Sequence, residues 1–211
     1  AEEISKADVQ RRELIANVSH DLRTPLTMIT GYAEMMRDIP GENTPENLQT
    51  IIDEANHLSA LVNDMLDLSR IDTEGKAPQK QRFSITETIK RVLGRYSALI
   101  AHEGYRIVFE PNGEAFVFAD EIMTVQVLYN LINNAVNYTG EDKTVVIRQQ
   151  ITAQKVKISI SDSGDGISPE HIPYIWDRYY KLDKVHRRAA VGSGLGLSIA
   201  CELLKRMNEE I

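Results

Sequence analysis

Two apolar stripes of helical period, separated by a short turn, limit most strongly how this chain can fold. Apolar residues recur at spacings of three and four over residues 14–36, and again over residues 48–66. Such spacing places them on one face of a helix. Between the stripes, residues 38–45 (DIPGENTP) carry two prolines and a glycine, so we expect a break there. Thr44 can cap a second helix with Pro45 at its first position, which predicts a helical hairpin.

A hairpin with one strong stripe on each helix cannot bury both stripes well by itself. Two hairpins can do so as a four-helix bundle, and we therefore expect a homodimer. The predicted domains are the hairpin at residues 1–72, a polar linker at residues 73–81 and a second domain at residues 82–211.

The second domain mixes helical periods with short alternating segments. Helices are predicted over residues 84–103, 120–138 and 199–207, and strands over residues 105–110, 115–118, 144–152 and 155–162. The last two strands are joined by a tight turn and form a hairpin. This order predicts an α+β layer in which helices cover one sheet.

Charge and cysteine content exclude several classes of protein. The net charge is −7, from 24 basic and 31 acidic residues, which argues against nucleic acid as a partner. A single cysteine, Cys201, rules out an internal disulfide and favours a reducing compartment. No apolar run approaches the roughly 20 residues of a membrane span, and no signal peptide is recognised, so we expect a soluble chain.

His20 has unusual surroundings on the first helix. Helical geometry places it away from the apolar stripe, with Thr24 on the same exposed face one turn later. Pro25 removes a hydrogen-bond donor and clashes with the carbonyl of Asp21, which predicts strain and a kink beside His20. An exposed imidazole next to Asp21 is a candidate nucleophile, because the carboxylate can orient the ring and accept its proton. A surface histidine without a function is the alternative interpretation, and we adopt it for the other four histidines.

Two glycine clusters indicate a phosphate site. Residues 162–166 (DSGDG) follow a predicted strand, and residues 192–196 (GSGLG) precede a predicted helix, whose terminal amides attract phosphate. Their spacing fits neither a dinucleotide fold nor a P-loop. The basic stretch at residues 178–188 could close over the site as a lid, or it could be a solvated charged loop.

A row of asparagines lies on the helix between residues 120 and 138. Asn130, Asn134 and Asn137 share one face by their spacing. The amide oxygen of asparagine suits Mg²⁺, which prefers oxygen ligands. A polar face turned to solvent is the alternative.

Five segments together resemble the conserved boxes of the sensor histidine kinases of two-component systems. In the family's order, residues 19–26 (SHDLRTPL) resemble the H box, 130–139 (NLINNAVNYT) the N box, 162–167 (DSGDGI) the G1 box, 175–181 (IWDRYYK) the F box and 192–197 (GSGLGL) the G2 box. The resemblance implies a dimeric four-helix bundle for dimerisation and histidine phosphotransfer. An α/β-sandwich ATP-binding domain, shared with chaperone and topoisomerase ATPases, would follow it.

The resemblance also implies a role for each residue. His20 would attack the γ-phosphate of ATP with Asp21 as general base, and Thr24 would orient a water that dephosphorylates the regulator. Asn134 would bind Mg²⁺, Asp162 would bind the adenine amino group and Tyr138 would pack on the ring. The remaining implied nucleotide-binding residues are Asn130, Gly164, Gly166, Ile167, Tyr180, Lys181, Gly192, Gly194, Leu195 and Gly196.

The implied partners are a second copy of the chain and the receiver domain of a response regulator, whose aspartate would accept the phosphoryl group. Membrane attachment would come only through an upstream sensor region, with this part in the cytoplasm. The chain departs from the family pattern at Asn137, where lysine is usual, at Met123, where arginine is common, and at Trp176, which replaces a phenylalanine. It ends at Ile211, where the family usually continues with a closing hairpin.

Two alternatives remain open from the sequence. One is a dimeric nucleotide-binding scaffold with weak or no kinase activity. The other is an ATPase of the related superfamily that forms no phosphohistidine.

Overall fold

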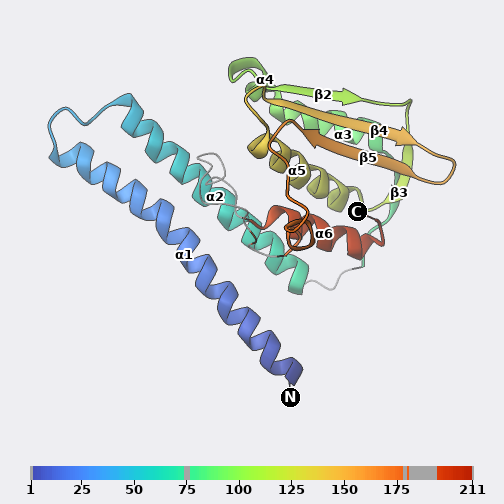
Figure 1. Ribbon diagram of the computed structural model, residues 1–211, viewed down its shortest axis with the longest axis horizontal. Helices are drawn as coiled ribbons and strands as arrows, with labels where there is room; N and C mark the ends of the chain where they lie inside the picture. The colour runs from blue at the N-terminus through green and yellow to red at the C-terminus, as the bar shows by residue number, and fades with distance from the viewer. Residues whose placement is uncertain (1, 74–76, 178–179, 181–193, 211) are drawn as a thin grey trace. The chain divides into compact units, whose positions relative to one another are not determined.

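The structure is a computed structural model that describes residues 2–73, 77–177, 180 and 194–210. It divides into two compact units, at residues 1–67 and 68–211. In the first unit, helix α1 (Glu2–Asp38) and helix α2 (Pro45–Thr73) form the predicted helical hairpin, and α2 continues into the second unit (Figure 1). As predicted, α2 begins at Pro45, and the Thr44 hydroxyl accepts a hydrogen bond from the Asn47 amide at 3.2 Å. The domain boundaries at residues 72 and 81 stay predictions.

The hairpin buries only part of its apolar surface. Pro25 on α1 and Leu61 on α2 are fully buried, whereas part of the predicted stripe on α2 is open to solvent. Leu48, Ile52, Val62 and Leu66 are each between 42% and 50% exposed. These four side chains share one face by their spacing, and we call this face the α2 stripe.

After the end of α2, the second unit continues with strand β1 (Gln81–Ser84) and three short helical segments. These are α3 (Ile85–Leu93), η1 (Gly94–Tyr96) and α4 (Ser97–His102). The sequence predicted one helix over residues 84–103. The prediction of one continuous helix was wrong, because α3 ends at Leu93 and the chain tightens into a 3₁₀ turn from Gly94. It was correct about the beginning, where the Ser84 hydroxyl accepts a hydrogen bond from the Glu87 amide at 3.2 Å.

Two sheets complete the second unit. β2 (Arg106–Glu110) pairs in parallel with β4 (Thr144–Ile151), and β4 pairs antiparallel with β5 (Val156–Asp162), as predicted for the hairpin. β3 (Phe116–Ala119) pairs antiparallel with β1 in a second sheet. The strand β1 was not predicted, and it begins at the last residue of the predicted linker.

One long helix covers the larger sheet. α5 (Glu121–Tyr138) packs against α6 (Gly196–Met207) and against β4 and β5 (Figure 1). The core of the second unit is apolar and fully buried, and includes Ile89, Ile132, Val145, Ile147, Ile199 and Leu203. A short 3₁₀ turn, η2 (Ile172–Tyr174), follows β5. α6 begins three residues before the predicted helix, so its first turn includes Gly196. The predicted α+β class is confirmed, but the strands form two sheets and not the single sheet expected, because β3 pairs with the unpredicted β1.

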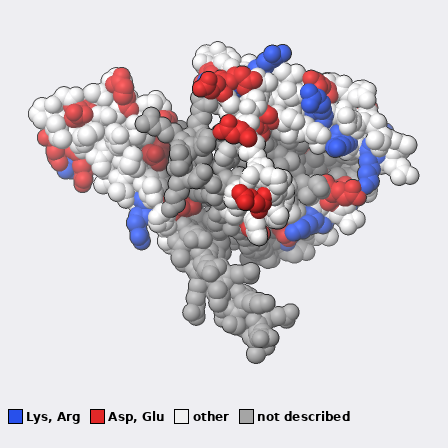
Figure 2. Space-filling view, viewed as in Figure 1, with Lys and Arg blue, Asp and Glu red and all other residues white. Residues whose placement is uncertain are grey.

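The surface of the described residues carries both signs of charge. Figure 2 shows acidic and basic side chains interspersed over the face in view. None of the described helices combines the length and the apolar character that a membrane-spanning segment needs.

Candidate active site

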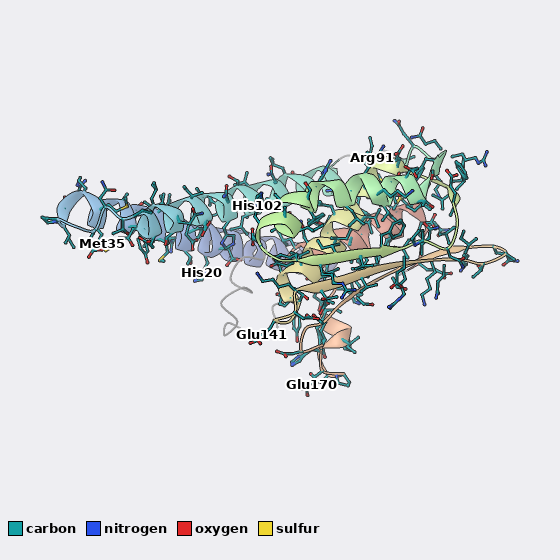
Figure 3. The ribbon with its side chains drawn as sticks, turned by 90° about the horizontal axis from the view of Figure 1, so that it is seen from above. His20, Met35, Arg91, His102, Glu141 and Glu170 are labelled. Carbon is teal, nitrogen blue, oxygen red and sulfur yellow. The ribbon has the colours of Figure 1, made fainter. Side chains whose placement is uncertain are left out.

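His20 lies on the exposed face of α1, as the helical geometry predicted (Figure 3). Its side chain is 75% exposed, whereas that of Asp21 is 24% exposed. Nδ1 of His20 lies 3.5 Å from Oδ1 of Asp21, at the outer limit of a hydrogen bond. The carboxylate therefore faces Nδ1 and leaves Nε2 as the ring nitrogen that can act as a nucleophile.

Thr24 lies one turn after His20 and is also exposed. Its hydroxyl donates a hydrogen bond to the backbone carbonyl of His20 at 3.3 Å. The helix continues through Pro25, whose ring is fully buried, and the kink expected beside His20 stays a prediction. A shallow open groove on this face is lined by His20, Arg23, Thr24, Thr27 and Met28. A planar or tetrahedral group could approach His20 along this groove.

The asparagines of α5 divide into two sets, as their spacing predicted. Asn133 accepts a hydrogen bond from the Tyr96 hydroxyl at 2.6 Å, so it links α5 to η1 and serves the fold. Burial raises the pKa of Tyr96, which keeps this phenol protonated as the donor. Asn130, Asn134 and Asn137 are half-buried on another face of the helix.

Asn130 is the most informative of these residues. Its Nδ2 atom is buried and has no hydrogen-bond partner among the described residues. A buried amide donor without a partner is costly and in native structures indicates a missing ligand or water. A Cβ atom added to Gly196 would lie 3.8 Å from Oδ1 of Asn130, so the unpaired amide lies beside the first turn of α6.

The start of α6 is a suitable place for phosphate. The first backbone amides of a helix lack partners within the helix and carry a positive partial charge, which attracts anions. Leu195 is fully buried and closes this turn, with its carbonyl accepting hydrogen bonds from Ser198 Oγ and from the Ile199 amide, both at 2.8 Å. Its side chain therefore packs in the core, and only its backbone can reach a nucleotide. Gly194 precedes it with a positive φ of 71°.

Asp162 lies at the end of β5, where the strand meets the glycine cluster. One carboxylate oxygen, Oδ1, accepts a hydrogen bond from the Gly164 amide at 2.9 Å, which leaves Oδ2 for a ligand. Gly166 has a positive φ of 77° and turns the chain toward Ile167, which is 39% exposed. The exposed fraction of Tyr138, at the end of α5, is 41%.

Tyr180 is held by His171, a residue for which the sequence indicated no role. Nδ1 of His171 lies 2.7 Å from the Tyr180 hydroxyl, and the rings of His171 and Tyr174 lie 6.2 and 5.8 Å from the Tyr180 ring. Glu170, labelled in Figure 3, precedes His171 in the turn that leads to η2. Of the other predicted residues, Lys181, Gly192 and most of the basic stretch at residues 178–188 lie outside the described residues.

Two further residues that the sequence did not single out, Thr139 and Ser163, join the end of α5 to the end of β5. Their hydroxyl oxygens lie 2.9 Å apart. Both lie within segments that resemble family boxes, but no role followed from that position. Contacts between segments far apart in the chain define this pair, so periodicity could not indicate it.

The donor set fits a magnesium ion held mainly by a nucleotide. Among the described residues, no group of three or more histidine, cysteine or acidic side chains is placed to hold a metal. Mg²⁺ at nucleotide sites keeps several waters and uses few protein ligands together with phosphate oxygens. One amide oxygen on the inner face of α5, that of Asn134, suits this mode of binding.

Comparisons with known proteins agree with this geometry. Residues 10–74 match the family model of the His Kinase A (phospho-acceptor) domain. Residues 119–211 match that of the histidine kinase-, DNA gyrase B- and HSP90-like ATPase. The chain is 33% identical over 200 residues to the sensor protein SrrB of Staphylococcus aureus (strain N315), covering 93% of this chain and 34% of SrrB. It therefore spans about a third of the length of the curated relatives that it matches.

Two solved structures extend the likeness. The first is histidine kinase ThkA in complex with response regulator protein TrrA, with a TM-score of 0.74 and 27% identity, covering 93% of this chain and 55% of that chain. The second is full-length ShkA in complex with AMPPNP, with a TM-score of 0.64 and 26% identity, covering 93% of this chain and 41% of that chain.

Proposed function

This chain belongs to the sensor histidine kinases of two-component systems, and we propose that it transfers the γ-phosphoryl group of ATP to His20 and then to a response regulator. The observation that carries the proposal is the buried, unpaired amide of Asn130 beside the first turn of α6. A phosphate group would satisfy this amide and the terminal amides of α6 at the same time. The AMPPNP bound by ShkA and the regulator bound by ThkA support the same donor and acceptor classes.

The phosphoryl transfer follows from the arrangement at His20. Nε2 attacks the γ-phosphorus, the bond from phosphorus to the β,γ-bridging oxygen breaks, and ADP leaves with that electron pair. Asp21 faces Nδ1, so its carboxylate accepts the Nδ1–H and stabilises the positive charge that the ring gains. In the second step, a carboxylate oxygen of the regulator's aspartate attacks the phosphorus, and the N–P electron pair returns to Nε2.

Asn134 is the residue that we propose as the protein ligand of Mg²⁺, through its amide oxygen. When bound, the ion would neutralise phosphate charge. Asp162, Tyr138 and Ile167 would hold the adenine, and Tyr180 and the glycines at 194 and 196 would lie toward the phosphates. Lys181 and Gly192 belong to the same proposed set.

We propose that the active form is a homodimer. The α2 stripe leaves four large apolar side chains 42–50% exposed, and Leu26 on α1 is 55% exposed. A second hairpin would cover them as a four-helix bundle. The kinase region itself would act in the cytoplasm, where ATP is available, and membrane attachment would come from parts of the protein outside this sequence.

Labelling with γ-labelled ATP and Mg²⁺ tests the proposed function. We expect acid-labile label in the wild type and none in His20→Ala or Asn134→Ala. His102→Ala is the matched control, because His102 is exposed on α4 and belongs to no proposed site. Label that persists in His20→Ala would overturn the choice of acceptor. ATP binding without label in any form would favour the nucleotide-binding scaffold.

We also propose that the chain dephosphorylates its regulator, with Thr24 orienting the attacking water. The hydroxyl lies on the face of His20 and is exposed, which supports this role. Thr24→Ala should leave autophosphorylation intact and slow loss of phosphate from the regulator, whereas Thr24→Ser should retain the wild-type rate. Equal rates for all three proteins would contradict the role of Thr24.

A further inference from the structure

The Ser163 hydroxyl joins three groups at the junction of α5, the following turn and β5. It lies 2.9 Å from the Thr139 hydroxyl, accepts a hydrogen bond from the Gly140 amide at 3.3 Å and donates one to Oδ1 of Asp142. Glu141, labelled in Figure 3, lies in the same turn. Ser163 thus forms hydrogen bonds with three residues of a segment that lies more than 20 residues earlier in the chain.

The ionised carboxylate fixes the direction of the hydrogen bond between Ser163 and Asp142. An ionised carboxylate only accepts, so the single Ser163 proton points to Asp142. The Ser163 oxygen is left as acceptor for Gly140 N–H. The Thr139 hydroxyl has one proton, which lies between two acceptors, the Thr144 carbonyl oxygen at 3.0 Å and the Ser163 oxygen at 2.9 Å. Thr139 is only 6% exposed, so it anchors the cluster in the interior.

Two glycines bring the backbones on either side of the cluster into direct contact. A Cβ atom on Gly140 would lie 2.6 Å from the Ser163 carbonyl oxygen, and one on Gly164 would collide with the Tyr138 carbonyl oxygen. Real Cβ atoms do not make such contacts. The loop after β5 therefore packs directly against the end of α5, and Ser163 lies at the centre of this contact.

Asp162 immediately precedes Ser163, in the loop that packs against the end of α5. Its Oδ1 is held by the Gly164 amide, so the direction of Oδ2 depends on where the loop lies. A carboxylate oxygen accepts a hydrogen bond from the 6-amino group of adenine. It repels the 6-oxo group of hypoxanthine, which presents an acceptor at the same position.

We propose that Ser163, with Thr139 and Asp142, is a positioning unit that aims the Asp162 carboxylate at the 6-amino group of the nucleotide and so contributes to base specificity. This inference rests on the proposed function, because it assumes that ATP binds at Asp162. It goes beyond that function in assigning a role to three residues outside the set proposed to bind the nucleotide.

Binding of ATP and of inosine triphosphate, measured by calorimetry, tests the positioning unit. Ser163→Ala should weaken ATP binding about fivefold, the size of one hydrogen bond, and should change binding of inosine triphosphate less than about twofold. Ser163→Thr keeps the hydroxyl and should restore ATP binding. Asp142→Asn should also weaken binding of ATP more than binding of inosine triphosphate. Ser161→Ala is the matched control, because Ser161 is exposed on β5 two residues earlier, and it should bind both nucleotides like the wild type.

The possible outcomes separate this inference from the proposed function. An equal loss of both nucleotides in Ser163→Ala would indicate a merely structural role and would overturn the inference, as would wild-type ATP binding. A wild-type protein that binds neither nucleotide would instead overturn the proposed function and, with it, the inference. Thermal unfolding of each variant identifies loss of the fold, and a variant that binds inosine triphosphate normally is folded at the site.

Discussion

The hydroxyl of Tyr180 and Nδ1 of His171 lie 2.7 Å apart, and this hydrogen bond ties the end of the F box to the turn before η2. Either group can be the donor, depending on the imidazole tautomer. The Tyr174 ring lies against the same tyrosine, 5.8 Å away. His171 is thus a structural support for a residue that we propose to contact the nucleotide.

We predict that His171→Ala raises the KM for ATP about three- to tenfold and changes kcat little, because the loss of one hydrogen bond loosens Tyr180. Tyr180→Phe should have a similar effect, and the double variant should be no worse than either single one. Autophosphorylation rates over a range of ATP concentrations measure this. Tyr174→Phe is the control, because it keeps the ring that lies against Tyr180, and it should behave as wild type. Fully additive losses in the double variant would contradict the coupling.

Gly164→Ala should abolish ATP binding and destabilise the second unit by roughly 2–4 kcal/mol, because the new methyl group collides with backbone at Tyr138. Urea unfolding and calorimetry measure the two effects. Gly94→Ala is the matched control in the same unit, where a Cβ atom meets nothing within 4 Å and the backbone is right-handed helical. We expect Gly94→Ala to be neutral or slightly stabilising. A Gly164→Ala protein as stable as Gly94→Ala would show that the loop can move away from α5.

The pH dependence of stability should reveal Asp142. Its hydrogen bond from Ser163, followed by those from Thr144, lowers the pKa of the carboxyl group in the folded protein. A lowered folded pKa stabilises the fold above the unfolded value, about 4, and this stabilisation is lost as the pH falls through the folded pKa. Asp142→Asn should therefore lower Tm at pH 7, and the difference from wild type should shrink by pH 3. A constant difference across this range would exclude the carboxylate as its cause.

Charge on the α2 stripe should prevent dimer formation. Ile52→Glu would bury a carboxylate against the second hairpin, which costs more than the remaining apolar contacts return. We expect a shift from dimer to monomer, measured by light scattering after gel filtration. Ala60→Glu adds the same charge at an exposed position of the same helix, roughly 80° around the axis from Ile52 and away from the stripe. It should leave the dimer intact, and a monomer in both variants would argue against the stripe as the interface.

Local patterns predicted the elements whose signals lie within their own residues. α2 begins at a proline after a capping threonine, and α5 begins after Asp120, whose carboxylate accepts a hydrogen bond from the Met123 amide at 3.1 Å. β1 was missed because four residues carry too little alternation. Its extended backbone depends on pairing with β3, in which Gln81 lies opposite Ala119.

The candidate site likewise contains some residues that local patterns predicted and others that they could not predict. Helical spacing correctly separated Asn133 from the other asparagines, because the face of a residue follows from its position in the helix. The supporting residues could not be predicted, since Ser163 meets Thr139 across 24 residues and His171 meets Tyr180 across a turn. Leu195 lies in the G2 box, but its burial follows from packing that the motif does not specify.

A substitution at Asn137 that increases the affinity for ATP can test which face of α5 contacts the nucleotide. It is half-buried on the face that holds Asn130 and Asn134, at a position where the resemblance to the N box led us to expect lysine. Asn137→Lys would bring a positive charge toward the phosphates, and a charge-assisted hydrogen bond is about twice as strong as a neutral one. We expect ATP to bind about three- to tenfold more tightly, measured by calorimetry.

Salt separates this charge effect from a change in packing. An attraction between lysine and phosphate at a half-exposed site is screened as ionic strength rises, so the gain should shrink between about 50 mM and about 500 mM salt. Asn137→Gln lengthens the side chain without adding charge and should keep wild-type affinity at both concentrations. If lysine gave no gain at low salt, position 137 would not face the phosphates. The nucleotide would then have to lie farther along the helix toward Asn130, whose buried amide still requires a partner.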